Sequence, residues 1–221
     1  MRAPVGAGEI ARAMAGQALL EAGIRELRLG IPQTAVRGLI QFCGLLAKWN
    51  RVYSLTSLRD PRDMIARHIL DSLAITDFVR GPRILDLGTG PGLPGLVLAL
   101  ARPDWQLVLL DSSRKKLRFV RQAIHELAIA NADVAETRAE AFRPGQRFDT
   151  VVCRAFASLR EIYALARPLC AETGLIMAMK GGYPEAELTE LPGAQVACTV
   201  HRLQVPGLDA ERHLVIMQTK D

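Results

Sequence analysis

The chain has 221 residues, enough for one domain of ordinary size, and 49% of them are hydrophobic, so we expect a sizeable buried core. No apolar run approaches the ~18 residues of a membrane span, and residues 1–16 hold no continuous apolar block, so we expect neither a membrane anchor nor a secretory signal. Four cysteines and four histidines are dispersed without a CxxC pair, which predicts no disulfide framework and no metal site and suits a reduced, cytoplasmic environment.

The formal charge of +5 is unevenly distributed along the chain. Residues 1–80 hold 11 Lys and Arg against 7 Asp and Glu, whereas residues 81–221 hold 17 against 16. This excess at the N-terminal end favours an anionic partner such as nucleic acid, although simple solubility explains a charge of this size about as well.

The N-terminal part of the sequence predicts helices. Apolar residues recur at helical spacing over residues 9–24 and 34–49. A third helix is predicted over residues 62–79, with Asp60 as its N-cap and Pro61 at its first position. We expect these helices to form an N-terminal cap that ends near residue 80.

One face of the predicted third helix carries His68, Asp71 and Ser72, at the spacing i, i+3, i+4. These side chains either orient one another toward a cleft or form a local capping and packing network, and the sequence does not separate the two.

From Arg83 onward, short apolar strands alternate with helices. Alternation of this kind predicts an α/β fold built on a doubly wound parallel sheet. The last two predicted strands have no helix between them, which predicts an antiparallel hairpin at one edge. The strands are predicted over residues 83–88, 107–111, 132–138, 148–155, 174–181, 195–205 and 213–219, and the helices over residues 93–101, 113–127 and 158–170.

The first of these strands runs into the glycine-rich stretch "RILDLGTGPGLPG". A strand that ends in glycines and leads into a helix is a place to bind a cofactor, because the backbone can approach the ligand closely. Gly90, Gly92 and Gly95 match a dinucleotide fingerprint, whereas Asp86 with Gly88, Gly90 and Gly92 matches the loop of S-adenosylmethionine (SAM) enzymes.

The residues around the loop favour SAM. The strand has already reached Gly88, so a dinucleotide loop that starts at Gly90 comes two residues late, and Pro94 removes an amide that a phosphate would use. Asp86 suits a ligand that carries an ammonium and a sulfonium. Asp111 ends the second strand and is placed to accept hydrogen bonds from ribose hydroxyls, as an acid does in both cofactor classes. The edge hairpin is typical of SAM methyltransferases.

The sequence constrains the methyl acceptor mainly by what it lacks. No Asn-Pro-Pro-Tyr-like tetrapeptide is present, which argues against an exocyclic amine, and no Pro-Cys dipeptide lies on the fourth strand. Cys153 on that strand is better explained as a small core thiol. A ring nitrogen with a free lone pair, such as purine N7, needs neither an activated nucleophile nor a base, since alignment with the methyl carbon suffices. This reasoning permits N7 without proving it.

Basic residues provide the next indication of a partner. On the predicted helix after the second strand, Arg114, Arg118 and Arg121 share one face, which fits RNA phosphates and an ordinary solvated surface equally well. Residues 48–59 interleave Lys and Arg with aromatic residues, a composition that suits RNA. For Trp49 a core position is the preferred interpretation.

With these motifs assembled, the chain resembles the bacterial small-subunit rRNA methyltransferase G family, formerly called glucose-inhibited division protein B. The first 45 residues match little beyond helical character, and Ser54 stands where members often have Asn, which puts a polar role of that position in doubt. The matching segments cover about Trp49 to the C-terminus and are "NRVYSLTSLRDPRDMIARHILDSL", "LDLGTGPGLPG", "LLDSSRKKLRFVRQ", "VVCRAFASL", "MKG" and "LQVPGLDAERHLVI".

The resemblance implies a class I SAM-dependent methyltransferase fold and transfer of a methyl group to N7 of a guanine in the 530 loop of 16S rRNA. It also implies cofactor roles for Gly88, Leu93, Ala139, Glu140 and Arg154, although a salt bridge to a neighbouring acid is the alternative for Arg154. We expect a cytoplasmic monomer that acts on 16S rRNA or the small ribosomal subunit, without a membrane.

The complete prediction is a helical cap (residues 1–80) on a SAM-binding methyltransferase domain (residues 81–221). Arg154 and His68 are candidates for positioning the acceptor, and no catalytic group is assigned. Alternatives are methylation of a small molecule or a protein, and an inactive SAM-binding module that binds RNA. The predicted cofactor residues are Asp86, Gly88, Gly90, Gly92, Leu93, Asp111, Ala139, Glu140 and Arg154. The RNA-binding candidates are Arg51, Arg67, Arg114, Lys115, Lys116, Arg118 and Lys180.

Overall fold

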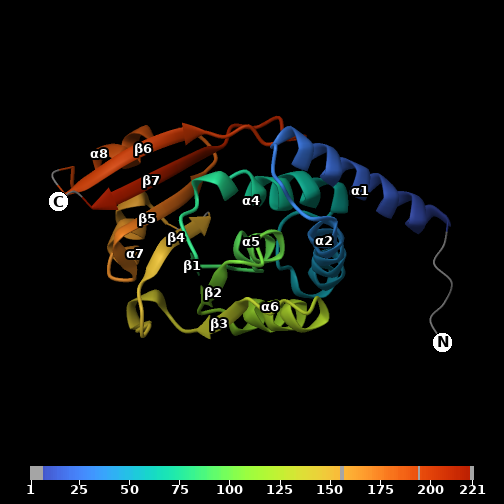
Figure 1. Cartoon of the computed structure of the whole chain (residues 1–221), viewed down its shortest axis with the longest axis horizontal. Helices are drawn as coiled ribbons and strands as arrows, with labels where there is room; N and C mark the ends of the chain where they lie inside the picture. The colour runs from blue at the N-terminus through green and yellow to red at the C-terminus, as the bar shows by residue number, and fades with distance from the viewer. Residues whose placement is uncertain (1–6, 155–156, 194, 220–221) are drawn as a thin grey trace.

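A computed structural model describes residues 7–154, 157–193 and 195–219, with side chains from Met14 onward. The described chain centres on a seven-stranded sheet in the order β3-β2-β1-β4-β5-β7-β6, with helices on both faces (Figure 1). The strands are β1 (Arg83–Leu87), β2 (Gln106–Asp111), β3 (Ala132–Glu136), β4 (Phe148–Arg154), β5 (Cys170–Lys180), β6 (Val196–Arg202) and β7 (His213–Thr219).

The strand pairing confirms the predicted doubly wound sheet and its edge hairpin. Strands β1 to β5 are parallel, and β7 lies antiparallel between β5 and β6. The chain starts at β1 and moves first toward β3 and then, from β4, toward the other edge. In sheets of this kind, ligands bind at the carboxyl ends of the strands beside the point of reversal, here β1 and β4.

Helices cover the two faces of the sheet unequally. Along β1, Ile84 belongs to the core on one face and Leu85 to the core on the other, as the alternation of a strand requires. The first core is continuous from Leu20 and Phe42 to the sheet, so the N-terminal helices and the sheet share it. The first face packs against α1 (Ala7–Glu26), α2 (Gln33–Tyr53), α5 (Gly95–Ala101) and α6 (Arg114–Glu126), and the second against α7 (Leu159–Ala166) and α8 (Glu185–Thr189) (Figure 1).

The helix predicted over residues 62–79 is confirmed as far as Leu73, but it is not regular and it ends earlier than predicted. Asp60 caps the start as expected, accepting from the Arg62 N–H at 2.8 Å. The helix then widens into a π-helical turn, and such turns are frequent at functional sites. Arg154, from β4, donates to the Arg67 carbonyl within this turn. The elements are α3 (Pro61–Met64), η1 (Ile65–Leu70), α4 (Asp71–Leu73) and η2 (Thr76–Phe78).

The boundaries around β5 also differ from the prediction. The helix predicted over residues 158–170 ends at Ala166, and β5 begins at Cys170, before the glycine that was taken as its start. The register with β4 shifts between Phe148 and Thr150. A Cβ on Gly174 would lie 2.9 Å from the Asp149 carbonyl oxygen, so this glycine permits a close approach inside the strand. Helix α8 was not predicted.

No helix in the described part of the chain is long and apolar enough to cross a membrane. Within the same residues, no group of three or more His, Cys, Asp or Glu side chains is arranged to hold a metal ion.

Candidate functional site

The glycine loop joins β1 to α5 at the carboxyl edge of the sheet. Gly90 and Gly92 have φ values of +57° and +88°, in the left-handed region that favours glycine. The Gly88 N–H donates to the Leu110 carbonyl at 2.9 Å, which ties the start of the loop to β2. The loop therefore has the conformation that the sequence predicted for a close backbone approach to a ligand.

Asp86, the last polar residue of β1, holds this loop in place through hydrogen bonds to two of its residues. Its side chain is fully buried, and Oδ2 accepts from Thr89 Oγ1 at 2.6 Å and from the Gly95 N–H at 2.7 Å. Burial raises the pKa of the carboxyl to about 6. Oδ1 is buried without a hydrogen-bond partner among the described residues. A buried acceptor left unpaired is costly, so this atom is suited to a donor on a ligand.

Gly95 is the tightest glycine of the loop. A Cβ at this position would lie 2.1 Å from Leu109 Cδ2 and 2.6 Å from Asp86 Oδ2. We expect Gly95→Ala to lower the free energy of unfolding by about 1–3 kcal/mol, as overpacking does, measured by urea denaturation. Gly145→Ala is the control because nothing lies within 4 Å of a Cβ there. An equal loss in both variants would contradict the expectation.

A cavity of about 290 Å³ lies beside the loop, at the carboxyl ends of β1, β2 and β3. It brings together four of the nine predicted cofactor residues, whereas Asp86, Gly90, Gly92, Leu93 and Arg154 are not in its lining. Sequence reasoning missed three polar lining residues, Ser112, Thr137 and Arg138. They could have been found from their position directly after the ends of strands, because α/β sheets bind ligands there. The lining is Leu87, Gly88, Leu110, Asp111, Ser112, Thr137, Arg138, Ala139 and Glu140.

Asp111 connects this cavity to the glycine loop. Its Oδ2 accepts from the Gly90 N–H at 2.9 Å, and its Oδ1 accepts from the Ser113 N–H at 2.7 Å. A carboxylate has about four lone-pair sites, so two remain for hydroxyl donors in the cavity. Asp111 thus both holds the loop and presents an acceptor surface that fits a ribose.

Arg154, at the end of β4, contacts the N-terminal helices. Its Nη1 donates to the Arg67 carbonyl at 3.1 Å and to Asp71 Oδ2 at 3.3 Å. Asp71 Oδ1 accepts from Arg212 Nε at 3.0 Å. Burial raises the pKa of Asp71, and the two arginines oppose that shift. The structure therefore contains the ion pair that was the alternative for Arg154, while its cofactor role stays a prediction.

His68 is buried beside this network. Thr56 Oγ1 lies 2.8 Å from His68 Nε2 and accepts from the Leu58 N–H, so the hydroxyl proton is free to donate to the ring. Nδ1 lies 3.0 Å from the Arg67 carbonyl oxygen and 3.4 Å from Arg154 Nη1, so both ring nitrogens have partners within the chain. Burial, and secondarily the Arg154 cation, lower the pKa of His68 to about 4.

The three residues predicted on one helix face do not act as a side-chain triad. Ser72 Oγ donates to the His68 backbone carbonyl at 2.6 Å, and Asp71 instead pairs with Arg154 at the end of β4 and with Arg212 just before β7. His68 therefore belongs to a local network, and its ring is held neutral.

A neutral buried histidine makes stability sensitive to acid. Because the unfolded His68 binds a proton near pH 6.5 and the folded one only near pH 4, stability is lost as the pH falls through this window. We expect the wild type to lose about 2 kcal/mol relative to His68→Gln between pH 7 and pH 5. The raised pKa of Asp86 changes stability in the opposite direction with pH, because this group favours the folded state at low pH. The effect of His68 is therefore measured as the difference between the wild type and His68→Gln. Substituting the exposed His125 should not reproduce the difference.

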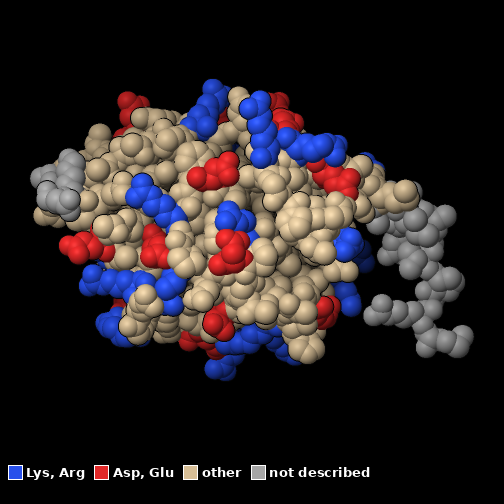
Figure 2. Space-filling model, in the orientation of Figure 1, with Lys and Arg blue, Asp and Glu red and all other residues tan. Residues whose placement is uncertain are grey.

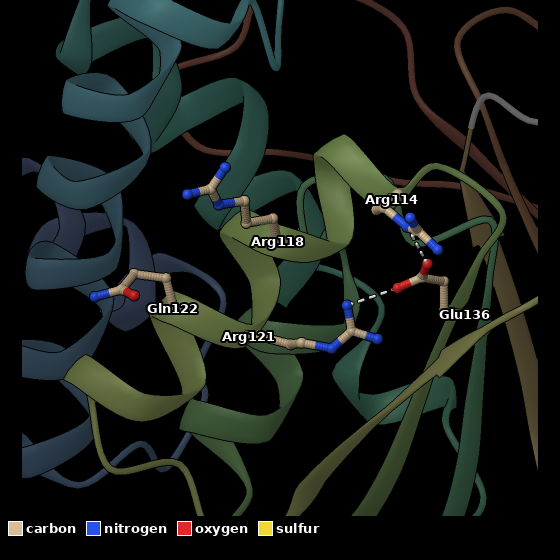
Figure 3. A pocket seen from close by; sticks show the side chains of 5 residues that line it. All are labelled: Arg114, Arg118, Arg121, Gln122 and Glu136. Carbon is tan, nitrogen blue, oxygen red and sulfur yellow. Dashed lines mark hydrogen bonds and ion pairs between the residues drawn. The ribbon is translucent and has the colours of Figure 1, made fainter.

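The basic candidates on α6 are partly neutralised (Figure 3). Glu136 accepts from Arg114 Nε at 3.0 Å and from Arg121 Nη1 at 2.7 Å. Arg118 points away from Glu136 (Figure 3) and has no ion-pair or hydrogen-bond partner among the described residues. With Gln122, these residues line a shallow cavity of about 500 Å³.

The other RNA candidates are distributed over the surface. Arg51, Arg67 and Lys115 are exposed, and Lys116 is half-buried. Figure 2 shows Lys and Arg interspersed with Asp and Glu on the face in view, so that face carries no patch of a single sign.

Two further predictions concern aromatic and basic side chains. The Trp49 ring stacks on Tyr53 and meets the edge of Phe119 at 5.6 Å between centroids, which confirms the preference for a packing role.

Lys180 Nζ donates to the Ala157 carbonyl at 2.9 Å and pairs with Glu187 at 2.7 Å. Its ammonium therefore has partners within the chain.

Comparisons with known proteins agree with this geometry. A putative O-methyltransferase from Klebsiella pneumoniae shares the fold with a TM-score of 0.60 at 14% identity, covering 95% of this chain and 99% of that one. A ribosomal protein L11 methylase from Lactobacillus delbrueckii subsp. bulgaricus has a TM-score of 0.53 at 16% identity, over 69% of this chain and 77% of that one. The fold is therefore that of class I SAM-dependent methyltransferases.

Sequence relatives are much closer. The chain is 50% identical to the ribosomal RNA small subunit methyltransferase G of Methylococcus capsulatus, over 89% of this chain and 95% of that protein. It is 48% identical to the protein of the same name from Alkalilimnicola ehrlichii, over 91% and 93% of the two chains. The family model for rRNA small subunit methyltransferase G (GidB) matches residues 35–215. The chain belongs to the rRNA small subunit methyltransferase G family.

Proposed function

We propose that this protein transfers the methyl group of SAM to N7 of a guanine in the 530 loop of 16S rRNA. The observation that carries the proposal is the cavity beside the glycine loop, because its acid and backbone groups suit a nucleoside and it lies in a chain of this family. The substrate class comes from the names of the relatives, and the N7 position from the resemblance of the motifs.

The residues present fit SAM as the cofactor. Asp111 offers free lone pairs for the ribose hydroxyls, and Ala139 and Glu140 border the same cavity on the β3 side. The unpaired Oδ1 of Asp86 is a buried acceptor suited to a donor such as the ammonium of the methionine part. When bound, SAM supplies a methyl group on a positively charged sulfur. Gly88 and its neighbours let the backbone approach it closely.

The described side chains near β4 favour an acceptor that needs no activation. Burial raises the pKa of the Cys153 thiol to about 12, so a nucleophilic thiolate is absent at neutral pH. The ring of His68 is neutral and engaged at both nitrogens, so it is not a free base. A purine N7 already has an available lone pair, and the protein's task is then to align it with the methyl carbon.

RNA binding is assigned to exposed basic side chains. Arg51, Arg67, Lys115 and Arg118 are exposed, and each can contribute one phosphate contact without internal competition from an ion pair. We expect a monomeric, cytoplasmic enzyme, and the absence of a membrane partner is part of the same proposal.

The test is transfer of isotopically labelled methyl from SAM to three substrates, namely small ribosomal subunits, protein-free 16S rRNA and cell extract. We expect label in 16S rRNA, and mapping of modified nucleotides in cells with and without the gene should locate one N7-methylguanine in the 530 loop. Label confined to proteins or metabolites would overturn the rRNA substrate. SAM binding without any transfer would support an inactive binding module instead.

A further inference from the structure

Lys180 ends β5 and has its ammonium fully engaged inside the protein. Its Nζ donates to the Ala157 carbonyl at 2.9 Å and to Glu187 Oε1 and Oε2 at 3.0 and 2.7 Å. The Lys180 side chain is 16% exposed. An ammonium has three N–H donors, and three acceptor atoms lie within hydrogen-bond distance. A phosphate would have to displace one of them.

Glu187 extends this contact to a second backbone group. Its Oε2 also accepts from the Leu159 N–H at 2.7 Å. Leu159 is the first residue of α7, whose opening amides have no partner within the helix. Ser158 between them forms a capping box with Glu161. The Lys180–Glu187 pair therefore holds the backbone on both sides of Ser158, at the Ala157 carbonyl and at the Leu159 amide.

The position of this backbone in the fold makes the contact relevant to the reaction. Ala157 and Leu159 follow β4 in the chain, and β4 pairs with β1, which leads into the glycine loop. The carboxyl ends of these two strands border the crevice in which doubly wound sheets bind ligands. A methyl acceptor must enter this crevice to meet the methyl carbon. A displacement of about 1 Å in such a position can cost a hundredfold in rate.

We propose that Lys180 and Glu187 are positioning residues, which fix the backbone at Ala157–Leu159 beside the acceptor, and that Lys180 does not bind an RNA phosphate. This inference rests on the proposed methyl transfer to rRNA. It replaces the hypothesis from sequence that Lys180 belongs to the RNA-contacting set. It also gives α8 a role, since this helix carries the carboxylate that completes the contact.

The variants are Lys180→Met and Glu187→Gln, which remove one charge each at similar side-chain length. Glu185→Gln is the matched control, because Glu185 is exposed on the same helix. We expect kcat for 16S rRNA methylation to fall about tenfold in both variants, with KM for SAM and affinity for rRNA unchanged. The losses in the double variant should be less than additive, because the two side chains share one ion pair. Additive losses would overturn the proposal.

Salt dependence separates positioning from phosphate contact. Losing one phosphate contact lowers the slope of log affinity against log salt by about 0.7 to 0.9. We expect Lys180→Met to leave this slope unchanged. A lower slope with unchanged kcat would overturn the proposal in favour of direct RNA binding.

Hydrogen exchange distinguishes failure of this inference from failure of the proposed function. If the wild type transfers no methyl group to rRNA, the proposed function fails, yet exchange of the amides at the start of α7 still reports on the contact. Faster exchange in both variants, with Glu185→Gln like the wild type, supports the Lys180–Glu187 contact. Unchanged exchange overturns it, whatever the substrate.

Discussion

Asp71→Ala is expected to lower the free energy of unfolding by about 3 kcal/mol and to remove most methyl transfer. The Asp71 side chain is only 4% exposed, and it is the shared partner of Arg154 and Arg212. Removing one member of a buried ion pair costs about 3–5 kcal/mol because the remaining charge is left uncompensated. The two arginine side chains are 19% and 21% exposed, so water compensates in part and the lower end of the range applies.

Activity should fall because Arg154 also loses the carboxylate that orients it toward the N-terminal helices. Urea denaturation measures the stability, and single-turnover transfer to rRNA at a temperature where the variant stays folded measures the activity. Asp63→Ala is the control, since Asp63 is an exposed acid in α3 that forms no ion pair among the described residues. A loss of stability without loss of activity would confine Asp71 to a structural role.

Asp111→Ala is expected to weaken SAM binding about 100-fold, which corresponds to about 2.7 kcal/mol. Two effects combine. The variant loses the acceptor for the ribose, and it releases the Gly90 and Ser113 amides that the carboxylate now holds in place. Charge-assisted hydrogen bonds of this kind contribute about 1.5–3 kcal/mol each when they are lost.

Calorimetric titration of SAM measures this effect directly. Asp133→Ala, an exposed acid on β3, is the matched control and should bind SAM like the wild type. Unchanged SAM affinity in Asp111→Ala would remove the ribose role from Asp111 and with it the assignment of the cavity to SAM.

Much of the fold could be predicted from local pattern. Strands and helices each have a characteristic spacing of hydrophobic residues, so their alternation can be read from the sequence. Two successive strands without a helix between them predict the edge hairpin. The π-helical turn at Ile65–Leu70 could not be predicted, because the Arg154 donor that binds its backbone lies on a distant strand. Gly174 was misleading for a related reason. A glycine in a sequence usually indicates the end of a strand or helix, whereas Gly174 lies inside β5 and permits a close backbone contact there.

The candidate site was predictable where chemistry follows directly from a strand end. Gly88 and Asp111, which were chosen at strand ends, line the cavity, as do Ala139 and Glu140, which the resemblance implied. Their roles toward the cofactor stay predictions. Pairings between distant segments carried no such signal. Asp71 and Arg212 are 141 positions apart in the chain, and the sequence around each residue does not predict their ion pair.

The shared core has a consequence for how the molecule moves. Phe42 of α2 is fully buried and lies against Phe119 of α6, with ring centroids 6.1 Å apart, in the core that the N-terminal helices share with the sheet. We therefore expect the N-terminal helices to stay packed on the sheet during exchange of SAM and product, and not to open as a lid. Because this core is shared, we expect heating to unfold the helices and the sheet in one transition.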